Sequence, residues 1–99
     1  MAATRASHRL RLTAETAALI RGLHPDIKKK IRSGLEAMCR NPQAGKMLKQ
    51  ELAGLRSYRV GRFRIVYRMA VKGVLEIVAV GPRQTIYRET YRLLLRKPR

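Results

Sequence analysis

Three stretches rich in β-branched and aromatic residues follow one another in the second half of the chain, and a short connection that contains glycine separates each from the next. They cover residues 57–60, 63–69 and 74–80, with Gly61-Arg62 between the first two and Lys72-Gly73 directly before the third. Val, Ile, Tyr and Phe suit the pleated surface of a sheet, and two-residue connections with glycine form tight hairpins. The sequence therefore predicts a three-stranded antiparallel meander.

The first half of the chain carries one strand pattern and two helix patterns. Residues 8–12 alternate apolar and basic side chains, as in a half-buried edge strand. Thr13 can cap the helix that follows, and His24-Pro25 interrupts it because the residue before a proline avoids the helical region. A second helix begins at Pro25 and ends before Asn41-Pro42. Apolar residues recur on one of its faces at helical spacing: Ile27, Ile31, Leu35 and Met38.

Glycines break the segment from Pro42 to Gly54, and no element is assigned there. A terminal helix is predicted from about Thr85 by apolar spacing that includes Tyr87, Tyr91 and Leu94. The patterns together predict an α+β fold in a single domain, residues 1–99. Its order is an N-terminal strand, a two-helix pair packed on an antiparallel β-sheet (β-α-α-β-β-β) and a short C-terminal helix.

The predicted turns fix which side chains face each other across the sheet. A two-residue loop at Gly61-Arg62 places Arg59 directly opposite Arg64 on one face. The same rule at the second turn places Arg64 opposite Gly81, with Arg83 just beyond it. Like charges in such pairs are destabilising, so adjacent guanidinium groups indicate that an anion fits between them. Three arginines are therefore expected to converge.

The other face of the meander would carry the apolar side chains that receive the second helix. They are Tyr58, Val60, Phe63, Ile65, Tyr67, Met69, Val78 and Val80. A slip of one residue in either hairpin would turn arginines into the core, where an unpaired charge costs several kcal/mol. Glu76 is a misfit, because the predicted register puts it on this apolar side near Met69. Fraying of the sheet end and pairing with a basic residue are both possible explanations.

The charge balance indicates a polyanionic partner. The chain has 23 Lys and Arg against 6 Asp and Glu, which gives a formal net charge of +17 at pH 7. Self-repulsion at this charge disfavours the compact state, and RNA, DNA or an acidic protein would relieve it. A charged surface that only aids solubility usually mixes basic and acidic residues. The strong excess of basic residues in this chain therefore favours binding to a polyanion.

Several kinds of protein are disfavoured by the composition. A single cysteine, Cys39, allows no internal disulfide, and no apolar run approaches the roughly 18 residues of a membrane span. We therefore expect a cytoplasmic protein without membrane contact. The sequence contains no metal-ligand spacing, phosphate-binding glycine loop or paired carboxylates, so no cofactor is expected. Catalysis would depend on arginine, lysine and tyrosine, which can orient a phosphate and stabilise charge in its transition state.

A series of short motifs runs along nearly the whole chain. They are Lys28 to Leu35 with Asn41-Pro42, Gly45-Lys46, Leu48-Lys49, Glu51-Leu52, Gly54-Leu55, Tyr58-Arg59-Val60-Gly61, Phe63 to Arg68, Val80-Gly81 with Arg83, and Ile86-Tyr87-Arg88. No single motif is highly specific. In its order and spacing, the series resembles a RelE-type toxin of the RelE/ParE superfamily.

The resemblance implies a toxin of a type II toxin-antitoxin pair, neutralised by an acidic antitoxin, that enters the ribosomal A site and cleaves mRNA there. The ribose 2′-hydroxyl attacks the adjacent phosphodiester in that reaction. Arg64 matches the family's transition-state arginine, Arg83 the arginine that serves the leaving group, and Tyr87 the tyrosine that stacks on or orients the substrate. Arg59 stands where one branch has a lysine proposed as general base. Arginine keeps its proton, so Arg59 is expected to clamp phosphate and the identity of the base stays open.

Further basic residues are candidates for RNA contacts. Those expected to touch the RNA backbone are Lys46, Lys49 and Arg62, and those expected to touch ribosomal RNA are Lys28, Lys29, Lys30 and Arg32. Each of them could instead be a solvated charge, and Tyr87 could simply pack the terminal helix onto the sheet. Two other functions stay open because fold does not fix function: a ParE-like poison of DNA gyrase, and an inactive basic RNA-binding relic.

Overall fold

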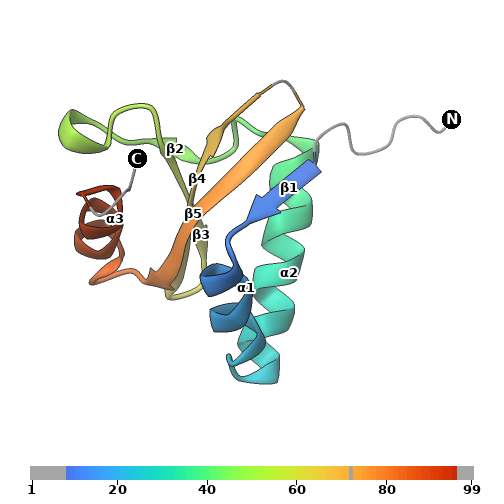
Figure 1. The fold of residues 1–99 in the computed structure, drawn as a ribbon. Helices are drawn as coiled ribbons and strands as arrows, with labels where there is room; N and C mark the ends of the chain where they lie inside the picture. The colour runs from blue at the N-terminus through green and yellow to red at the C-terminus, as the bar shows by residue number, and fades with distance from the viewer. Residues whose placement is uncertain (1–8, 72, 96–99) are drawn as a thin grey trace, which may run out of the picture.

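The computed structural model describes residues 9–71 and 73–95 (Figure 1). The elements in chain order are β1 (Arg9–Leu12), α1 (Ala14–Arg21), α2 (Pro25–Arg40), β2 (Lys46–Met47), the 3₁₀ turn η2 (Gln50–Leu52), β3 (Arg56–Val60), β4 (Phe63–Met69), β5 (Val74–Pro82) and α3 (Ile86–Leu95). The helix pair α1–α2 covers one face of the sheet, and α3 lies against the other. The predicted α+β class is confirmed.

The sheet has five strands in the order β1-β5-β4-β3-β2. Strands β3, β4 and β5 form the predicted antiparallel meander, and β1 is an edge strand as expected. However, β1 runs parallel to β5, so the prediction of a wholly antiparallel sheet is wrong at this edge. Two helices separate β1 from the rest of the sheet, and only a short hairpin forces consecutive strands to run antiparallel.

Both helices of the pair begin where the sequence predicts, and α2 also ends there, but α1 already ends at Arg21, before the predicted interruption at His24-Pro25. Thr13 Oγ1 caps α1 by accepting a hydrogen bond of 3.0 Å from the backbone N–H three residues later. Pro25 is the first residue of α2, where His24 Nδ1 accepts a bond of 3.1 Å from the Asp26 N–H. The C-terminal cap of α2 is Asn41. Caps and proline act within a few residues, which is why the sequence alone locates these boundaries.

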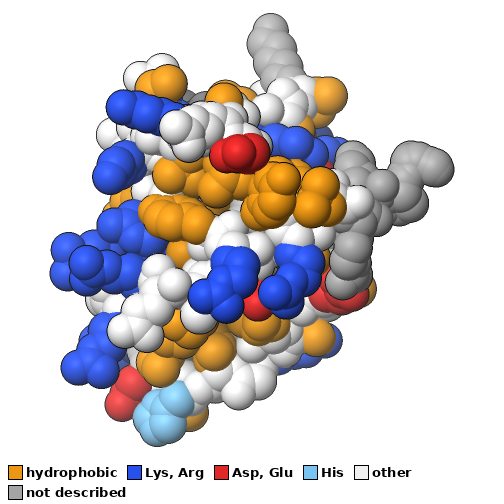
Figure 2. Space-filling model, turned by 90° about the vertical axis from the view of Figure 1, so that its left-hand side faces the viewer, with side chains coloured by type: hydrophobic (Ala, Val, Ile, Leu, Met, Phe, Trp, Pro, Cys, Tyr) orange, Lys and Arg blue, Asp and Glu red, His pale blue; other side chains and the backbone are white. Residues whose placement is uncertain are grey.

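One apolar cluster lies on each face of the sheet. The larger lies under the helix pair and includes Ile31, Leu35, Met38, Ile65, Tyr67, Leu75 and Ile77. The smaller lies under α3 and consists of Leu55, Val66, Ala79 and Ile86 with partly buried neighbours. On the α3 side, Tyr91 and Leu95 stay exposed, and Figure 2 shows hydrophobic side chains among basic ones on this face. The terminal helix is therefore held by a modest apolar contact.

The turn between β4 and β5 is longer than predicted. Ala70 N–H donates to the Val74 carbonyl at 2.9 Å, which closes a three-residue loop. Its last residue, Gly73, has φ +79°, the left-handed conformation that commonly ends such loops. Met69 consequently lies opposite Leu75. The predicted two-residue turn is wrong, and the pairing beside the turn is displaced by one residue.

A β-bulge in β5 cancels this displacement further along the strand. The register shifts between Val66 and Tyr67, so that β5 contains one extra residue at this point. Beyond the bulge Arg64 lies opposite Gly81, as predicted. Val78 packs with the cluster under α3, so its predicted place on the helix-pair face is wrong. The two departures from ideal geometry offset each other, and the far end of the sheet keeps its predicted alignment.

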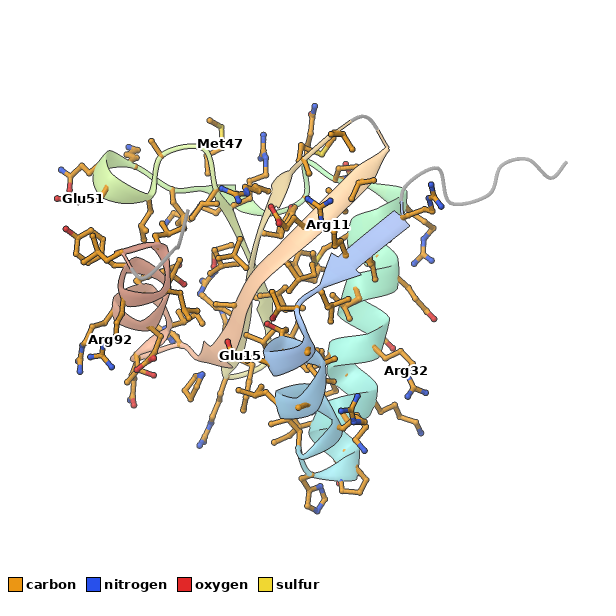
Figure 3. All side chains as sticks on the ribbon, in the orientation of Figure 1. Arg11, Glu15, Arg32, Met47, Glu51 and Arg92 are labelled. Carbon is orange, nitrogen blue, oxygen red and sulfur yellow. The ribbon has the colours of Figure 1, made fainter. Side chains whose placement is uncertain are left out.

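The displaced register also explains Glu76. This residue lies opposite Arg68 and alternates with the core residues on either side of it, so it faces away from the helix pair. Arg68 Nε donates to its Oε1 at 2.7 Å, and Arg11 Nη2 donates to its Oε2 at 3.3 Å. Figure 3 labels the Arg11 side chain on β1. The Arg68 hydrogen bond is the main reason that the pKa of Glu76 is lowered. Pairing with basic residues is therefore the correct explanation of the misfit, and it ties β1 to β5 and β4.

Tyr67 holds the segment that follows α2, for which the sequence predicts no element. Its hydroxyl donates to the Pro42 carbonyl at 2.8 Å and accepts from the Gly45 N–H at 2.9 Å. A Cβ at Gly45 would lie 2.6 Å from this hydroxyl oxygen, so the contact requires glycine. The chain then continues into β2, where Lys46 lies opposite Ser57 of β3.

Glu76→Gln should make the stability of the fold less dependent on pH. The folded-state pKa of Glu76 is lowered, so its contribution is present above the unfolded pKa and is lost as pH falls through the folded pKa. At neutral pH the substitution should reduce the free energy of unfolding by about 1 kcal/mol. Urea unfolding at several values between about pH 7 and about pH 3 measures this difference, which should shrink toward acid. A difference that stays constant would contradict the assignment.

Tyr67→Phe should reduce the free energy of unfolding by about 1–3 kcal/mol, because it leaves the Gly45 N–H and the Pro42 carbonyl without their buried partner. Tyr58→Phe, at a half-buried position of β3, is the matched control and should change stability by less than about 0.5 kcal/mol. Denaturant unfolding followed by circular dichroism gives both values. Equal losses in the two variants would overturn this role for Tyr67.

Candidate active site

The β3–β4 turn brings arginines from two strands together. Val60 lies opposite Phe63 and Arg59 opposite Arg64, as a two-residue turn requires. Gly61 in this turn has φ +61°, which glycine adopts without strain. Residues directly opposite each other leave the same face of the sheet with Cβ atoms about 5 Å apart. The two guanidinium groups therefore start from neighbouring positions on the face that carries α3.

An open hollow of about 770 Å³ lies beside this turn. It is lined by Arg59, Gly61, Arg62, Phe63, Pro82, Arg83 and Gln84. Arg83 N–H donates to the Arg62 carbonyl at 2.8 Å, which fixes the end of β5 against the turn. Among the described residues the lining contains three arginines and no carboxylate. A hollow of this composition suits an anionic group such as phosphate.

Arg64 is half-buried and held by a serine. Its Nη1 donates to Ser57 Oγ at 3.0 Å, and the Tyr87 hydroxyl donates to the same oxygen at 3.1 Å. Ser57 is only 2% exposed. One buried oxygen that accepts two hydrogen bonds restricts the rotamers of both donors. We refer to these residues as the Arg64–Ser57–Tyr87 group; it joins β4, β3 and α3.

The sequence patterns do not single out Ser57, although a signal for it exists. Side chains alternate along a strand, so Ser57 shares a face with Arg59. In the predicted register it is also the diagonal neighbour of Arg64. A small hydroxyl beside two arginines on one face is thus readable from the predicted register, but only the tertiary structure shows that α3 brings Tyr87 to it.

The three arginines that the sequence brings together take up two adjacent positions. Arg59 and Arg83 line the hollow, whereas Arg64 lies in the Arg64–Ser57–Tyr87 group opposite Arg59. The ion pairs found in residues 9–71 and 73–95 involve other residues: Arg11–Glu76, Arg68–Glu76, Arg92–Glu89 and His24–Asp26. Within that part of the chain, no carboxylate neutralises the three arginines.

Two of the predicted RNA-contact residues lie near β2. Lys46 is opposite Ser57, so it leaves the sheet on the same face as the Arg64–Ser57–Tyr87 group. Lys49 is exposed at the start of η2. A third, Arg62, lines the hollow. The structure thus gathers Lys46 and Arg62 around the arginines, while Lys49 lies further out along the chain.

The basic residues of α2 line two different hollows. Lys29 and Lys30 line a second hollow together with Arg59. Lys28 and Arg32 line a different one, between α1 and α2. Figure 3 shows the Arg32 side chain projecting from α2 away from the sheet. Only half of this predicted set therefore lies next to the arginines.

The described residues offer few other functional groups for catalysis or metal binding. Within residues 9–71 and 73–95, no three His, Cys, Asp or Glu side chains gather as possible metal ligands. No helix in that part of the chain is long and apolar enough to cross a membrane. Cys39 packs in the larger cluster, where burial raises the pKa of its thiol. Arginine, serine and tyrosine thus supply the functional groups of the site.

The fold is similar to solved toxin structures. The RelBE2 toxin-antitoxin complex of Mycobacterium tuberculosis contains a chain 29% identical to this one with a TM-score of 0.69, over 78% of this chain and 99% of that one. Escherichia coli RelE, as a double mutant in the free state, is 17% identical with a TM-score of 0.71, over 90% and 95%. RelE in the RelE–RelB complex of Pyrococcus horikoshii is 19% identical with a TM-score of 0.63, over 78% and 96%. No curated protein matches by sequence.

A family model gives the assignment. The model of the ParE toxin of the type II toxin-antitoxin system parDE matches residues 8–87, which span β1 to the start of α3. Together with the RelE structures, this match confirms the resemblance inferred from the motifs. The chain therefore belongs to the ParE toxin family and is a type II toxin of the RelE/ParE superfamily.

Proposed function

We propose that this toxin is a ribosome-dependent mRNA endoribonuclease that cleaves the message in the A site and so inhibits translation. The observation that carries the proposal is the Arg64–Ser57–Tyr87 group next to the hollow of Arg59 and Arg83. Such an arrangement offers guanidinium groups from different strands to one phosphodiester. The RelE toxins among the similar structures favour this branch of the superfamily.

Arg64 is assigned to the transition state. The ribose 2′-hydroxyl attacks the neighbouring phosphorus, the bond to the 5′-oxygen breaks, and a cyclic phosphate forms on the upstream nucleotide. Negative charge grows on the phosphorus oxygens during this step, and preorganised donors are most effective there. Ser57 takes up one N–H of the Arg64 guanidinium and leaves others to donate to the phosphate.

The other residues of the site are assigned by position. Arg83, at the rim of the hollow, stabilises or protonates the departing 5′-oxygen, and Arg59 clamps a non-bridging oxygen. Tyr87 is half-buried: it packs with the cluster under α3 while its hydroxyl donates to Ser57. The packing role and the positioning role of this tyrosine are therefore compatible. The part of its ring that stays exposed orients the substrate.

Proton removal from the 2′-hydroxyl needs a base, and arginine is a poor one because it keeps its proton far above neutral pH. Among the described residues that line the hollow there is no histidine, lysine or carboxylate. We assign this step to the assembled complex on the ribosome, which would account for a reaction that depends on the ribosome. A metal or other cofactor has no part in the proposal.

An acidic antitoxin is the proposed inhibitor. The toxin's net charge of +17 favours an acidic, partly disordered partner that covers the arginines. The solved structures of similar toxins from Mycobacterium tuberculosis and Pyrococcus horikoshii are complexes with antitoxins. Action on ribosomes also places the proposed activity in the cytoplasm.

Poisoning of DNA gyrase is the second candidate, and the ParE description of the matching family favours it. A supercoiling assay with purified gyrase separates the two candidates. Inhibition of gyrase without any cut in mRNA would replace the first proposal by the second. Absence of both activities would indicate an inactive RNA-binding relic.

Arg64→Ala should lower mRNA cleavage by about 100-fold or more, since removal of one preorganised donor to the transition state costs that much. Arg83→Ala should lower it less, by about tenfold to 100-fold. Toxin is added to a translation extract and the mRNA ends are mapped by primer extension. Arg9→Ala removes an equal charge at an exposed position of the edge strand β1, and its cleavage should match the parent. Codon-positioned cuts at the parental rate in Arg64→Ala would eliminate the proposal.

Ser57→Ala should lower cleavage by about tenfold, because it releases Arg64 and Tyr87 from their shared partner. Ser57 is a positioning residue, so its effect should depend on Arg64. In an Arg64→Ala background the additional loss from Ser57→Ala should be close to nil. The double-mutant cycle is measured by the same primer-extension assay, with thermal unfolding as the check on folding. Fully multiplicative losses would show that Ser57 acts in some other way.

A further inference from the structure

Two further hollows adjoin the hollow beside the β3–β4 turn, and they differ in charge. Arg59 lines both the first hollow and a hollow of about 340 Å³ between α2 and β3. Pro82 lines both the first hollow and a groove of about 400 Å³ between α1 and α3. A chain molecule bound at Arg59 and Arg83 could therefore continue in either of two directions.

Charge decides between these directions for a polyanion. The hollow at α2 is lined by Lys29, Lys30 and Arg59, with no carboxylate among its described residues. The groove at α3 is lined by Glu15 and Glu89, with no Lys or Arg among its described residues; Figure 3 labels Glu15 beside the end of β5. Phosphates are attracted to the first. In the second, Glu89 pairs with Arg92, but Glu15 adds a negative charge and no cation belongs to the described lining, so the second groove attracts them less.

Gly34 allows α2 to lie close to β3, which brings the lysines of the helix to the hollow at α2. A Cβ on Gly34 would lie 2.9 Å from Val60 Cγ2 and 3.3 Å from Tyr58 Cε2, so glycine lets the helix pack closely on β3. Lys30 is four residues before Gly34 and shares its helix face. Glycine inside a helix costs about 1 kcal/mol relative to alanine, and the close approach gives it a reason here.

Tyr58 adds an aromatic surface to the hollow at α2. It is half-buried on the α2 face of β3 and lines this hollow together with Arg59. Aromatic rings beside a row of cations are the usual composition of sites for single-stranded nucleic acid, where bases stack on rings and phosphates meet the charges. A double helix, by contrast, presents phosphates on a broad convex surface and hides its bases.

We infer that the hollow formed by Lys29, Lys30, Tyr58 and Arg59 is a binding site for single-stranded RNA, into which the substrate strand runs from the phosphodiester at Arg64 and Arg83. Lys28 and Arg32, which line the separate hollow between α1 and α2, take no part in it. The identity of the strand as RNA rests on the proposed function; the direction in which it leaves the active site rests on the two hollows and their charges.

Binding of a fluorescent single-stranded RNA with 2′-O-methyl riboses, which cannot be cleaved, tests the inference by anisotropy at several salt concentrations. The double variant Lys29→Gln/Lys30→Gln should weaken binding by about tenfold, and the slope of log affinity against log salt should fall by about 1.4, or about 0.7 for each lost contact. Lys28→Gln/Arg32→Gln removes the same net charge and should stay within about twofold of the parent with its slope unchanged.

Four outcomes would overturn the inference. Equal losses in the two double variants would mean that only the overall field matters. No loss of binding in Lys29→Gln/Lys30→Gln would mean that the strand runs elsewhere. If Glu15→Gln/Glu89→Gln were the variant whose affinity changed, by becoming tighter, the strand would lie in the groove at α3. A loss confined to double-stranded RNA would mean that the lysines contact a helical region of ribosomal RNA. All four lysine and arginine positions are partly or fully exposed, and thermal unfolding checks that each variant is folded.

The binding assay and the cleavage assay can refute the two proposals independently of each other. Selective loss of RNA binding in Lys29→Gln/Lys30→Gln, without any mRNA cutting by the parent, would end the endoribonuclease proposal and keep the strand site. Normal mRNA cutting by the parent, with equal binding by both double variants, would end the strand site and keep the endoribonuclease proposal.

Discussion

The hydrogen-bonded ladder between β3 and β4 is the constraint on which the rest of the structure depends. A two-residue turn fixes its register, and that register places Arg59 opposite Arg64 and Ser57 diagonally beside Arg64. Two arginines in direct opposition cost some tenths of a kcal/mol in the free protein. A slip of one residue would relieve that repulsion but would turn the guanidinium groups into the core under α2, at several kcal/mol. The core thus holds the charges together at the site.

The few acidic residues are placed so that the site keeps its positive charge. Glu76 pairs with Arg68 and Arg11 at the β1 side of the sheet, away from the β3–β4 turn. Arg64 is held by a serine hydroxyl instead. A carboxylate in the place of Ser57 would fix the guanidinium as well, but it would also cancel the charge that a phosphate needs. A neutral buried acceptor gives a fixed and still fully charged arginine.

The sequence predicts elements better than it predicts their irregularities. Caps at Thr13 and His24 and the turn at Gly61 act locally, so the helices and the first hairpin are found from the chain alone. The second hairpin shows the limit: the turn is one residue too long for the prediction, and the bulge near Val78 compensates for it. Only the packing of both sheet faces determines where such a bulge lies, because Ile77 and Val80 must reach one cluster and Ala79 the other.

By itself, the sequence determined the α+β class, the meander, the pairing of Arg59 with Arg64 and the superfamily, since all of these follow from local periodicity, turn chemistry and motif order. Tertiary structure decided the rest. The parallel edge at β1, the attachment of Gly45 to Tyr67 and the meeting of Tyr87 with Arg64 on Ser57 join residues far apart in the chain. The division of the α2 lysines between two hollows likewise depends on which side of the helix packs against β3. Contacts of this kind are set by the packing of whole layers, and no local pattern in the chain encodes them.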